Sequence, residues 1–136
     1  MNELIQIIKI LEKEEVEQVN KYVDTLNFQG CTVFGKGNKQ DKSSGRTSTG
    51  VTLNENHNAT VNLHNKINEG LLEYKRRVEK IHRNFSYYPV PGGIHTKSWR
   101  EGIQVLQYEK TQQYKFHHDV ADDRELKEYH RQISVI

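Results

Sequence analysis

The feature that most constrains the fold of this chain is a long stretch of helical periodicity over residues 58–85. Its apolar residues include Val61, and from Ile67 onward they recur at spacings of three, four or seven: Ile67, Leu71, Val78, Ile81 and Phe85. Such spacings place these residues on one face of an amphipathic helix. Asn58 stands where a capping residue is expected. A helix with a single apolar face has to cover that face with another layer of structure.

Most of the other segments have the composition of strands. Strands are predicted at residues 4–10, 31–34, 46–53, 103–108 and 114–118, with a further strand beginning in residues 131–136. A second amphipathic helix is predicted over residues 14–26. No repeat or linker divides the chain, so residues 1–136 are expected to form a single domain. The order of the elements favours an α+β fold, in which helices pack on one face of a mainly antiparallel sheet.

The charges of the chain do not favour a nucleic-acid partner. The 20 basic and 18 acidic residues nearly balance, and the basic run from Lys75 to Arg77 is flanked by Glu73 and Glu79. We therefore expect that run to be a solvated helix face. Cys31 is the single cysteine, which excludes an internal disulfide and favours a reducing compartment. Without a signal-peptide pattern or a long apolar run, we expect a soluble, cytoplasmic protein with no membrane partner.

The segment QVLQYEKTQQYKFHHD, residues 104–119, ends in candidate metal ligands. It is expected to form two strands joined by a tight connection. Because side chains alternate along a strand, His117 and Asp119 share a face while His118 points the other way. One imidazole and one carboxylate are two of the three ligands in a two-His, one-carboxylate iron site. HxD taken alone is a weak signal, and a hydrogen-bonded surface histidine is its ordinary alternative.

The sequence lacks the motifs of other common metal sites. No HExxH motif is present for a metalloprotease zinc site. A cysteine-based zinc site is not possible with one cysteine. The acidic residues Asp119, Asp122 and Asp123 lack the spacing of an EF-hand calcium loop.

The residues around HxD make the motif more specific, because the whole segment resembles the front half of the iron site in prolyl 4-hydroxylase-type Fe(II)/2-oxoglutarate dioxygenases. Those enzymes typically carry a strand like QVxxY, a turn, an aromatic residue and then HxD. The matching residues here are Gln104, Val105, Tyr108, Gln112, Tyr114, His117 and Asp119. Further matches in the family's order are the R-x-S pattern of Arg46 and Ser48, the acidic Glu101, and Arg131 at the start of a strand.

The chain departs from this family pattern in two ways. Thr111 stands where the turn usually has glycine. The later family elements are absent, namely the distal histidine ligand, the basic residue that pairs with the 2-oxoglutarate carboxylate, and the remaining strands. Because the last residues, ISVI, have the composition of the middle of a strand, we expect the chain to be the front part of a longer protein. We also expect these 136 residues alone to be inactive.

The resemblance implies a double-stranded β-helix, also called a jelly-roll or cupin-like fold, with helices packed on one sheet and with its C-terminal strands missing. Residues 1–136 would then be the N-terminal part of a dioxygenase domain. The implied reaction is hydroxylation of a peptidyl residue, with proline as the expected target and with succinate and CO2 as co-products. Fe(II) and 2-oxoglutarate are implied, together with ascorbate and O2, and the implied partner is a protein or peptide substrate.

The resemblance also implies a role for individual residues. The implied metal ligands are His117 and Asp119, the implied 2-oxoglutarate pocket includes Tyr108 and Tyr114, and the implied peptide contacts are Arg46, Ser48, Glu101 and Arg131. In an ideal strand Tyr114 would face away from His117. Two alternatives stay open. One is a non-catalytic binding or scaffold module of the same fold, and the other is a dioxygenase that acts on a different substrate, such as a free amino acid.

Overall fold

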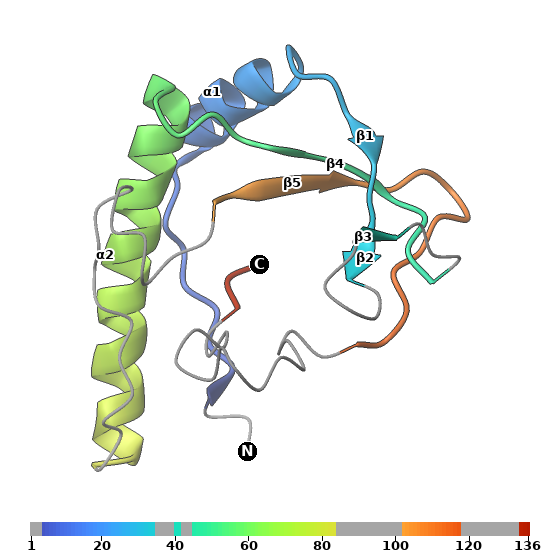
Figure 1. Ribbon diagram of the computed structural model, residues 1–136. Coiled ribbons are helices and arrows are strands. Elements are labelled where there is room, and N and C mark those ends of the chain that lie inside the picture. Colours follow the sequence, from blue (N-terminus) through green and yellow to red (C-terminus); the bar gives the residue numbers. More distant parts are fainter. Residues whose placement is uncertain (1–3, 35–39, 42–44, 84–101, 118–133) are drawn as a thin grey trace.

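The computed structural model describes residues 4–34, 40–41, 45–83, 102–117 and 134–136. In these ranges the elements are two helices, α1 (Lys13–Val23) and α2 (Asn58–Ile81), and five short strands: β1 (Gln29–Gly30), β2 (Val33–Phe34), β3 (Gln40–Asp41), β4 (Thr49–Thr52) and β5 (Gln104–Gln107). A three-stranded antiparallel sheet has the order β1-β4-β5, and β2 pairs with β3 separately. Figure 1 shows α2 along one side of the molecule, with β4 and β5 extending away from it.

Two helices and an antiparallel sheet are the elements that the predicted α+β class requires. The double-stranded β-helix itself stays a prediction. α1 lies against the N-terminal end of α2 (Figure 1). The backbone N–H of Asn54, just after β4, donates a hydrogen bond of 3.2 Å to the Tyr22 hydroxyl of α1, which joins the sheet to the helices. Within the described ranges, no helix has both the length and the apolar character needed to cross a membrane.

The cap of α2 is His57, one residue before the expected Asn58. Its Nδ1 accepts a hydrogen bond of 3.2 Å from the backbone N–H of Ala59. The His57 ring also stacks on the Tyr22 ring, with 3.6 Å between centroids and an interplanar angle of 4°. A polar side chain that accepts from the first turn stabilises the start of a helix. The same side chain therefore caps α2 and holds it against α1.

The buried core is small in the part of the chain that the structure describes. Val78 of α2 is fully buried, and Leu53, just after β4, is 3% exposed. Thr60 and His64 of α2 are also buried. Val61, which belongs to the predicted apolar stripe of α2, is 40% exposed. The described residues therefore cover only part of that stripe.

Residues 4–10 do not form the predicted strand. No other strand pairs with them in the described ranges, and side chains of α2 bind their backbone instead. The Tyr74 hydroxyl donates to the Leu4 carbonyl at 3.0 Å, and Nη1 of Arg77 donates to the Ile7 carbonyl at 3.2 Å. β-branched residues favour an extended backbone, but a strand also needs a partner backbone to satisfy its hydrogen bonds. Here the helix supplies those partners.

The two predicted strands in residues 104–118 do not fold back on each other as a hairpin. β5 pairs with β4, with Gln107 opposite Thr49. After the turn, Tyr114 forms a single bridge opposite Arg46, in the segment that leads into β4. A step of three residues from Thr49 to Arg46 is therefore matched by a step of seven from Gln107 to Tyr114. The turn is thus an excursion of four extra residues between two segments that follow the same neighbour.

Both segments lie on the same edge of that neighbour. Along an antiparallel strand, successive residues point their N–H and C=O groups to opposite sides, so residues an even number apart point them to the same side. Leu53 donates its N–H to the carbonyl of Ile103, and Thr47 donates its N–H to the carbonyl of Gln113, each at 2.9 Å. The even spacing of these donors places both partners on one side. The carbonyl of Ser48 points to the other side, where it accepts a hydrogen bond from the residue after β1.

The basic run of α2 is paired with acidic residues of the same helix. Lys75 lies 3.2 Å from a carboxylate oxygen of Glu79, and Arg76 and Arg77 lie 2.6 and 2.7 Å from an oxygen of Glu73. Hydrogen bonds from Arg76 and Arg77 lower the pKa of Glu73 to about 2. The basic residues of this run are thus paired within the helix, and the expectation about nucleic-acid partners stays a prediction.

Candidate functional site

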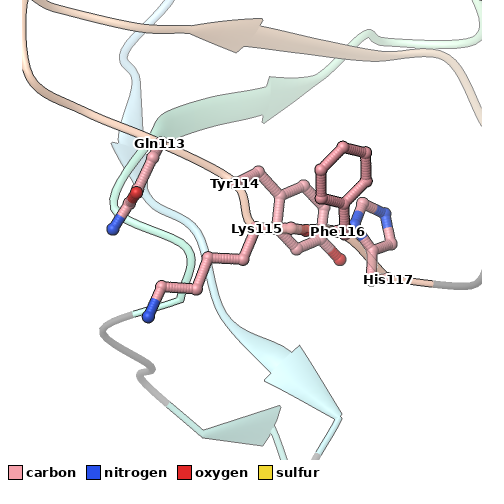
Figure 2. A pocket seen from close by; sticks show the side chains of 5 residues that line it. All are labelled: Gln113, Tyr114, Lys115, Phe116 and His117. Atoms are coloured by element: carbon pink, nitrogen blue, oxygen red, sulfur yellow. Dashed lines mark hydrogen bonds between the residues drawn. The ribbon is translucent and has the colours of Figure 1, made fainter.

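The candidate site is an open hollow beside the residues that follow the excursion. It has a volume of about 630 Å³ and is lined by Gln113, Tyr114, Lys115, Phe116 and His117. Figure 2 shows the rings of Tyr114, Phe116 and His117 gathered on one side of the backbone, while the side chains of Gln113 and Lys115 extend to the other. The sequence had suggested Tyr114 and His117 for this site, and the structure brings them together.

A backbone hydrogen bond sets the tautomer of His117. Its Nδ1 lies 2.8 Å from the carbonyl oxygen of Lys115. A carbonyl oxygen can only accept a hydrogen bond, so Nδ1 carries the hydrogen. In the neutral imidazole the lone pair is then on Nε2. Histidines that bind metals commonly donate the other ring N–H to a carbonyl or carboxylate in this way, which fixes the orientation of the ring. The contact between Nδ1 of His117 and the Lys115 carbonyl is thus of the kind that orients metal-binding histidines.

The rings of Tyr114 and His117 face each other, contrary to the alternation of an ideal strand. Their centroids are 3.6 Å apart and their planes are inclined by 17°. Strand pairing is limited to the bridge at Tyr114, and the backbone bends at Phe116. Alternation with a period of two therefore does not continue as far as His117. The bend brings both rings into the same hollow.

Arg46 contacts the Tyr114 ring as well. Its guanidinium carbon lies 4.5 Å from the ring centroid, within the range of a cation–π contact. Nη1 donates to the backbone carbonyl of Thr32 at 3.1 Å, and Nη2 donates to Oε1 of Gln104 at 3.2 Å. The guanidinium thus connects three segments that are far apart in the sequence. Tyr114 receives the cation on its ring in addition to the stacked imidazole of His117.

The excursion is closed by a tight turn over residues 109–112. The N–H of Gln112 donates to the carbonyl of Glu109, and the N–H of Glu109 donates to Oε1 of Gln112, both at 2.9 Å. Thr111 has a φ of 83°, in the left-handed region that glycine favours. A positive φ at the third residue is the requirement of a type II turn. Thr111 stands where the family that the segment resembles usually has glycine, and it adopts a glycine-like backbone.

The positions of the remaining predicted site residues do not test the roles expected of them. Ser48 is 1% exposed, and its Oγ has no hydrogen-bond partner among the described residues. Tyr108, just after β5, is 45% exposed. The substrate role of the first and the 2-oxoglutarate role of the second stay predictions. Asp119, Glu101 and Arg131 lie outside the described residues. In the ranges that are described, no three His, Cys, Asp or Glu side chains are grouped to hold a metal ion.

Two residues contribute to the site in ways that the sequence did not indicate. Gln104 accepts a hydrogen bond from Arg46, and the carbonyl of Lys115 sets the tautomer of His117. The contact of Gln104 with Arg46 follows from the pairing of the strands. Gln104 and Tyr114 are an even number of residues apart and pair with the same segment, so their side chains lie on the same face of the sheet. A contact through a backbone carbonyl does not depend on the side chain, so the identity of Lys115 gives no signal.

Comparisons of this chain with protein-family models, with curated proteins and with solved structures find no match. Its function therefore has to be inferred from its own residues and their geometry.

Proposed function

We propose that this chain supplies His117 and Asp119 as ligands for Fe(II) in a 2-oxoglutarate-dependent dioxygenase that hydroxylates a peptidyl residue, with proline as the expected target. The observation that carries the proposal is the His117 ring. Its Nδ1 donates to the Lys115 carbonyl, which is the kind of contact that orients the ring of a metal-binding histidine. The part of the donor set that the structure describes thus fits the group. Two imidazoles and one carboxylate are the ligands that non-haem Fe(II) takes, and His117 and Asp119 would supply one of each kind.

The iron supplies the oxidative chemistry when it is bound together with 2-oxoglutarate and O2, and ascorbate serves as the reductant. The protein's own part is to bind and orient. Tyr108 is proposed to donate its hydroxyl hydrogen to the 2-oxoglutarate carboxylate. Tyr114 holds the His117 ring by stacking and forms a wall of the hollow. We also propose a cytoplasmic location, because the single cysteine, Cys31, forms no disulfide.

The ligand assignment is tested with Mn(II), a paramagnetic and air-stable substitute for Fe(II). The chain is prepared with isotope-labelled histidine, and the ring resonances are followed by NMR as Mn(II) is added below the protein concentration. We expect the His117 resonances to broaden first, while those of His57 and His82 stay sharp. Asp119→Asn should abolish this selectivity, whereas Asp24→Asn, at the end of α1, should leave it unchanged. Uniform broadening of all three histidines would overturn the assignment.

The activity is tested by succinate formation from 2-oxoglutarate in the presence of Fe(II) and proline-containing peptides. The protein is expressed from its whole reading frame, as wild type, His117→Ala and His82→Ala. His82 ends α2 and is exposed, so it is a matched control for the loss of an imidazole. We expect turnover in the wild type and His82→Ala proteins only. Equal turnover in His117→Ala would show that this ring does not hold the iron.

A non-catalytic peptide-binding module of the same fold is the second candidate. It is favoured by Phe116, which is fully exposed beside the Tyr114 and His117 rings. Exposed aromatic side chains bind peptides without a metal. This candidate predicts that proline-containing peptides bind with the same affinity with and without Mn(II), and that Asp119→Asn does not change that affinity. The dioxygenase predicts that the metal is needed for turnover.

A further inference from the structure

We propose that Arg46 is a positioning residue for His117, rather than a contact for the peptide substrate. Its guanidinium holds the Tyr114 ring, and the Tyr114 ring holds the imidazole. The role of His117 as a metal ligand rests on the proposed function. The contacts by which Arg46 and Tyr114 orient the His117 ring do not depend on that role. Arg46 acts through another side chain and does not need to touch the substrate or the metal.

The hydrogen bonds of Arg46 fix both ends of its guanidinium within the protein. Nη1 donates to the Thr32 carbonyl and Nη2 donates to Gln104 Oε1. Nε is buried and has no partner among the described residues. To turn towards a substrate, the guanidinium would have to break these two hydrogen bonds, one at each Nη. A planar guanidinium with both ends fixed is instead suited to hold the flat face of an aromatic ring.

Two contacts in the described part of the chain bear on the position of His117. The imidazole is exposed, its Nδ1 bonds to the carbonyl two residues earlier, and one face stacks on Tyr114. The hydrogen bond to Lys115 is local, so it fixes the ring relative to its own segment and not relative to the sheet. The Tyr114 ring relates the imidazole to the sheet, and Arg46 contacts that ring from the neighbouring strand segment.

A backbone contact also supports the positioning of Tyr114 and His117 by Arg46. The N–H of Lys115 donates to the carbonyl of Gly45 at 2.8 Å, and Tyr114 is bridged to Arg46. The backbone pairing therefore brings the segment to Arg46, and the guanidinium then fixes the direction of the ring. Loss of the guanidinium alone should free the rings while the backbone pairing remains.

The experiment compares Arg46→Lys with Arg83→Lys in the full chain. Lysine keeps the charge but cannot donate to both the Thr32 carbonyl and Gln104 with the geometry of a fork. The readout is the upfield ring-current shift that the Tyr114 ring imposes on the His117 ring protons, together with the NOE between the two rings. We expect Arg46→Lys to lose most of the shift and the NOE. Arg83, exposed just after α2, should be neutral.

The methyl resonances of buried Val78 show whether Arg46→Lys folds. If it does not fold, substitutions of Gln104 provide the test. Gln104→Leu removes the acceptor of Nη2, and Gln104→Glu keeps one. We expect the ring-current shift to fall in Gln104→Leu and to persist in Gln104→Glu. Full shifts in folded Arg46→Lys, or in Gln104→Leu if Arg46→Lys does not fold, would overturn the positioning role.

The same variants separate this inference from the proposed function. If both are right, Arg46→Lys should also weaken Mn(II) binding at His117 by about 10-fold, as is common for residues that orient a metal ligand. If the ring-current shift is lost but Mn(II) never selects His117, the positioning role stands and the metal assignment fails. If Mn(II) selects His117 but the shift is unchanged in the decisive variant, the metal assignment stands and Arg46 has no positioning role.

Discussion

Replacing Thr111 with glycine should stabilise the protein. Thr111 has a φ of 83°, and its side chain is exposed. For an L-residue with a Cβ, the left-handed region costs roughly 1–2 kcal/mol, and a β-branched residue there is a marked outlier. Glycine removes that cost, but it also gives the unfolded chain more freedom, which costs roughly 0.5–1 kcal/mol. The net expectation is a gain of about 0.5–1 kcal/mol in the free energy of unfolding.

The neighbouring residue of the turn provides the matched control. Lys110 is exposed as well, and its φ is not positive. Lys110→Gly therefore adds freedom to the unfolded chain without relieving any backbone strain. It should destabilise the protein by about 0.5–1 kcal/mol. The two substitutions to glycine, at adjacent exposed positions, should thus have opposite signs.

Urea denaturation, followed by circular dichroism of the helices, measures both changes as shifts of the midpoint at constant slope. Thr111→Gly should raise the midpoint and Lys110→Gly should lower it. Thr111→Asn should fall between wild type and Thr111→Gly, because asparagine tolerates the left-handed region better than threonine does. If Thr111→Gly lowers the midpoint as much as Lys110→Gly does, the turn does not hold Thr111 in a strained conformation.

Three further changes test the packing of the helices. Val78→Ala should cost about 2–3 kcal/mol, because Val78 is fully buried, while Val61→Ala on the same helix should cost less than about 1 kcal/mol; equal losses in urea denaturation would contradict the described core. His57→Ala should cost about 1–2 kcal/mol by removing both the cap and the Tyr22 stack, and His57→Asn should restore the cap alone; a neutral His57→Ala would refute both contacts. The pKa of Glu73 is lowered from 4.5 to about 2, so its contribution to stability is present above the higher value and is lost as the pH falls towards the lower one. Glu73→Gln should therefore be less stable than wild type at neutral pH, the difference should shrink as the pH falls towards 2, and a difference that is constant with pH would contradict this pairing.

The parts of the fold that could be predicted from the sequence are those set by local periodicity. The long helix begins at Asn58 as expected, because its apolar residues repeat with the period of a helix over many turns. β4 lies within the predicted strand at 46–53, since threonine and valine there favour an extended backbone. Residues 4–10 have the same tendency, but their hydrogen-bond partners are Tyr74 and Arg77, more than sixty residues later. No local pattern could show that.

The candidate site was predictable only in part for the same reason. HxD and the aromatic residue before it are sequence patterns, and they led to Tyr114 and His117. The stacking of these two rings depends on a bend at Phe116, where the pairing of the backbone stops. The contact with Arg46 depends on the register of the sheet, which leaves out four residues between Gln107 and Tyr114. Register comes from long-range pairing and turn geometry, so it was not available from composition or spacing.

The four-residue excursion has a consequence for how such a chain can change in evolution. The residues before it and after it are aligned independently by pairing with the segment from Gly45 to Leu53. An insertion at Lys110 would therefore lengthen a loop and leave the alignment on either side intact. Each doubling of loop length costs only about 0.6 kcal/mol in closure entropy. Descendants of this chain could acquire a new recognition loop here, a few residues before His117, at little risk to the sheet.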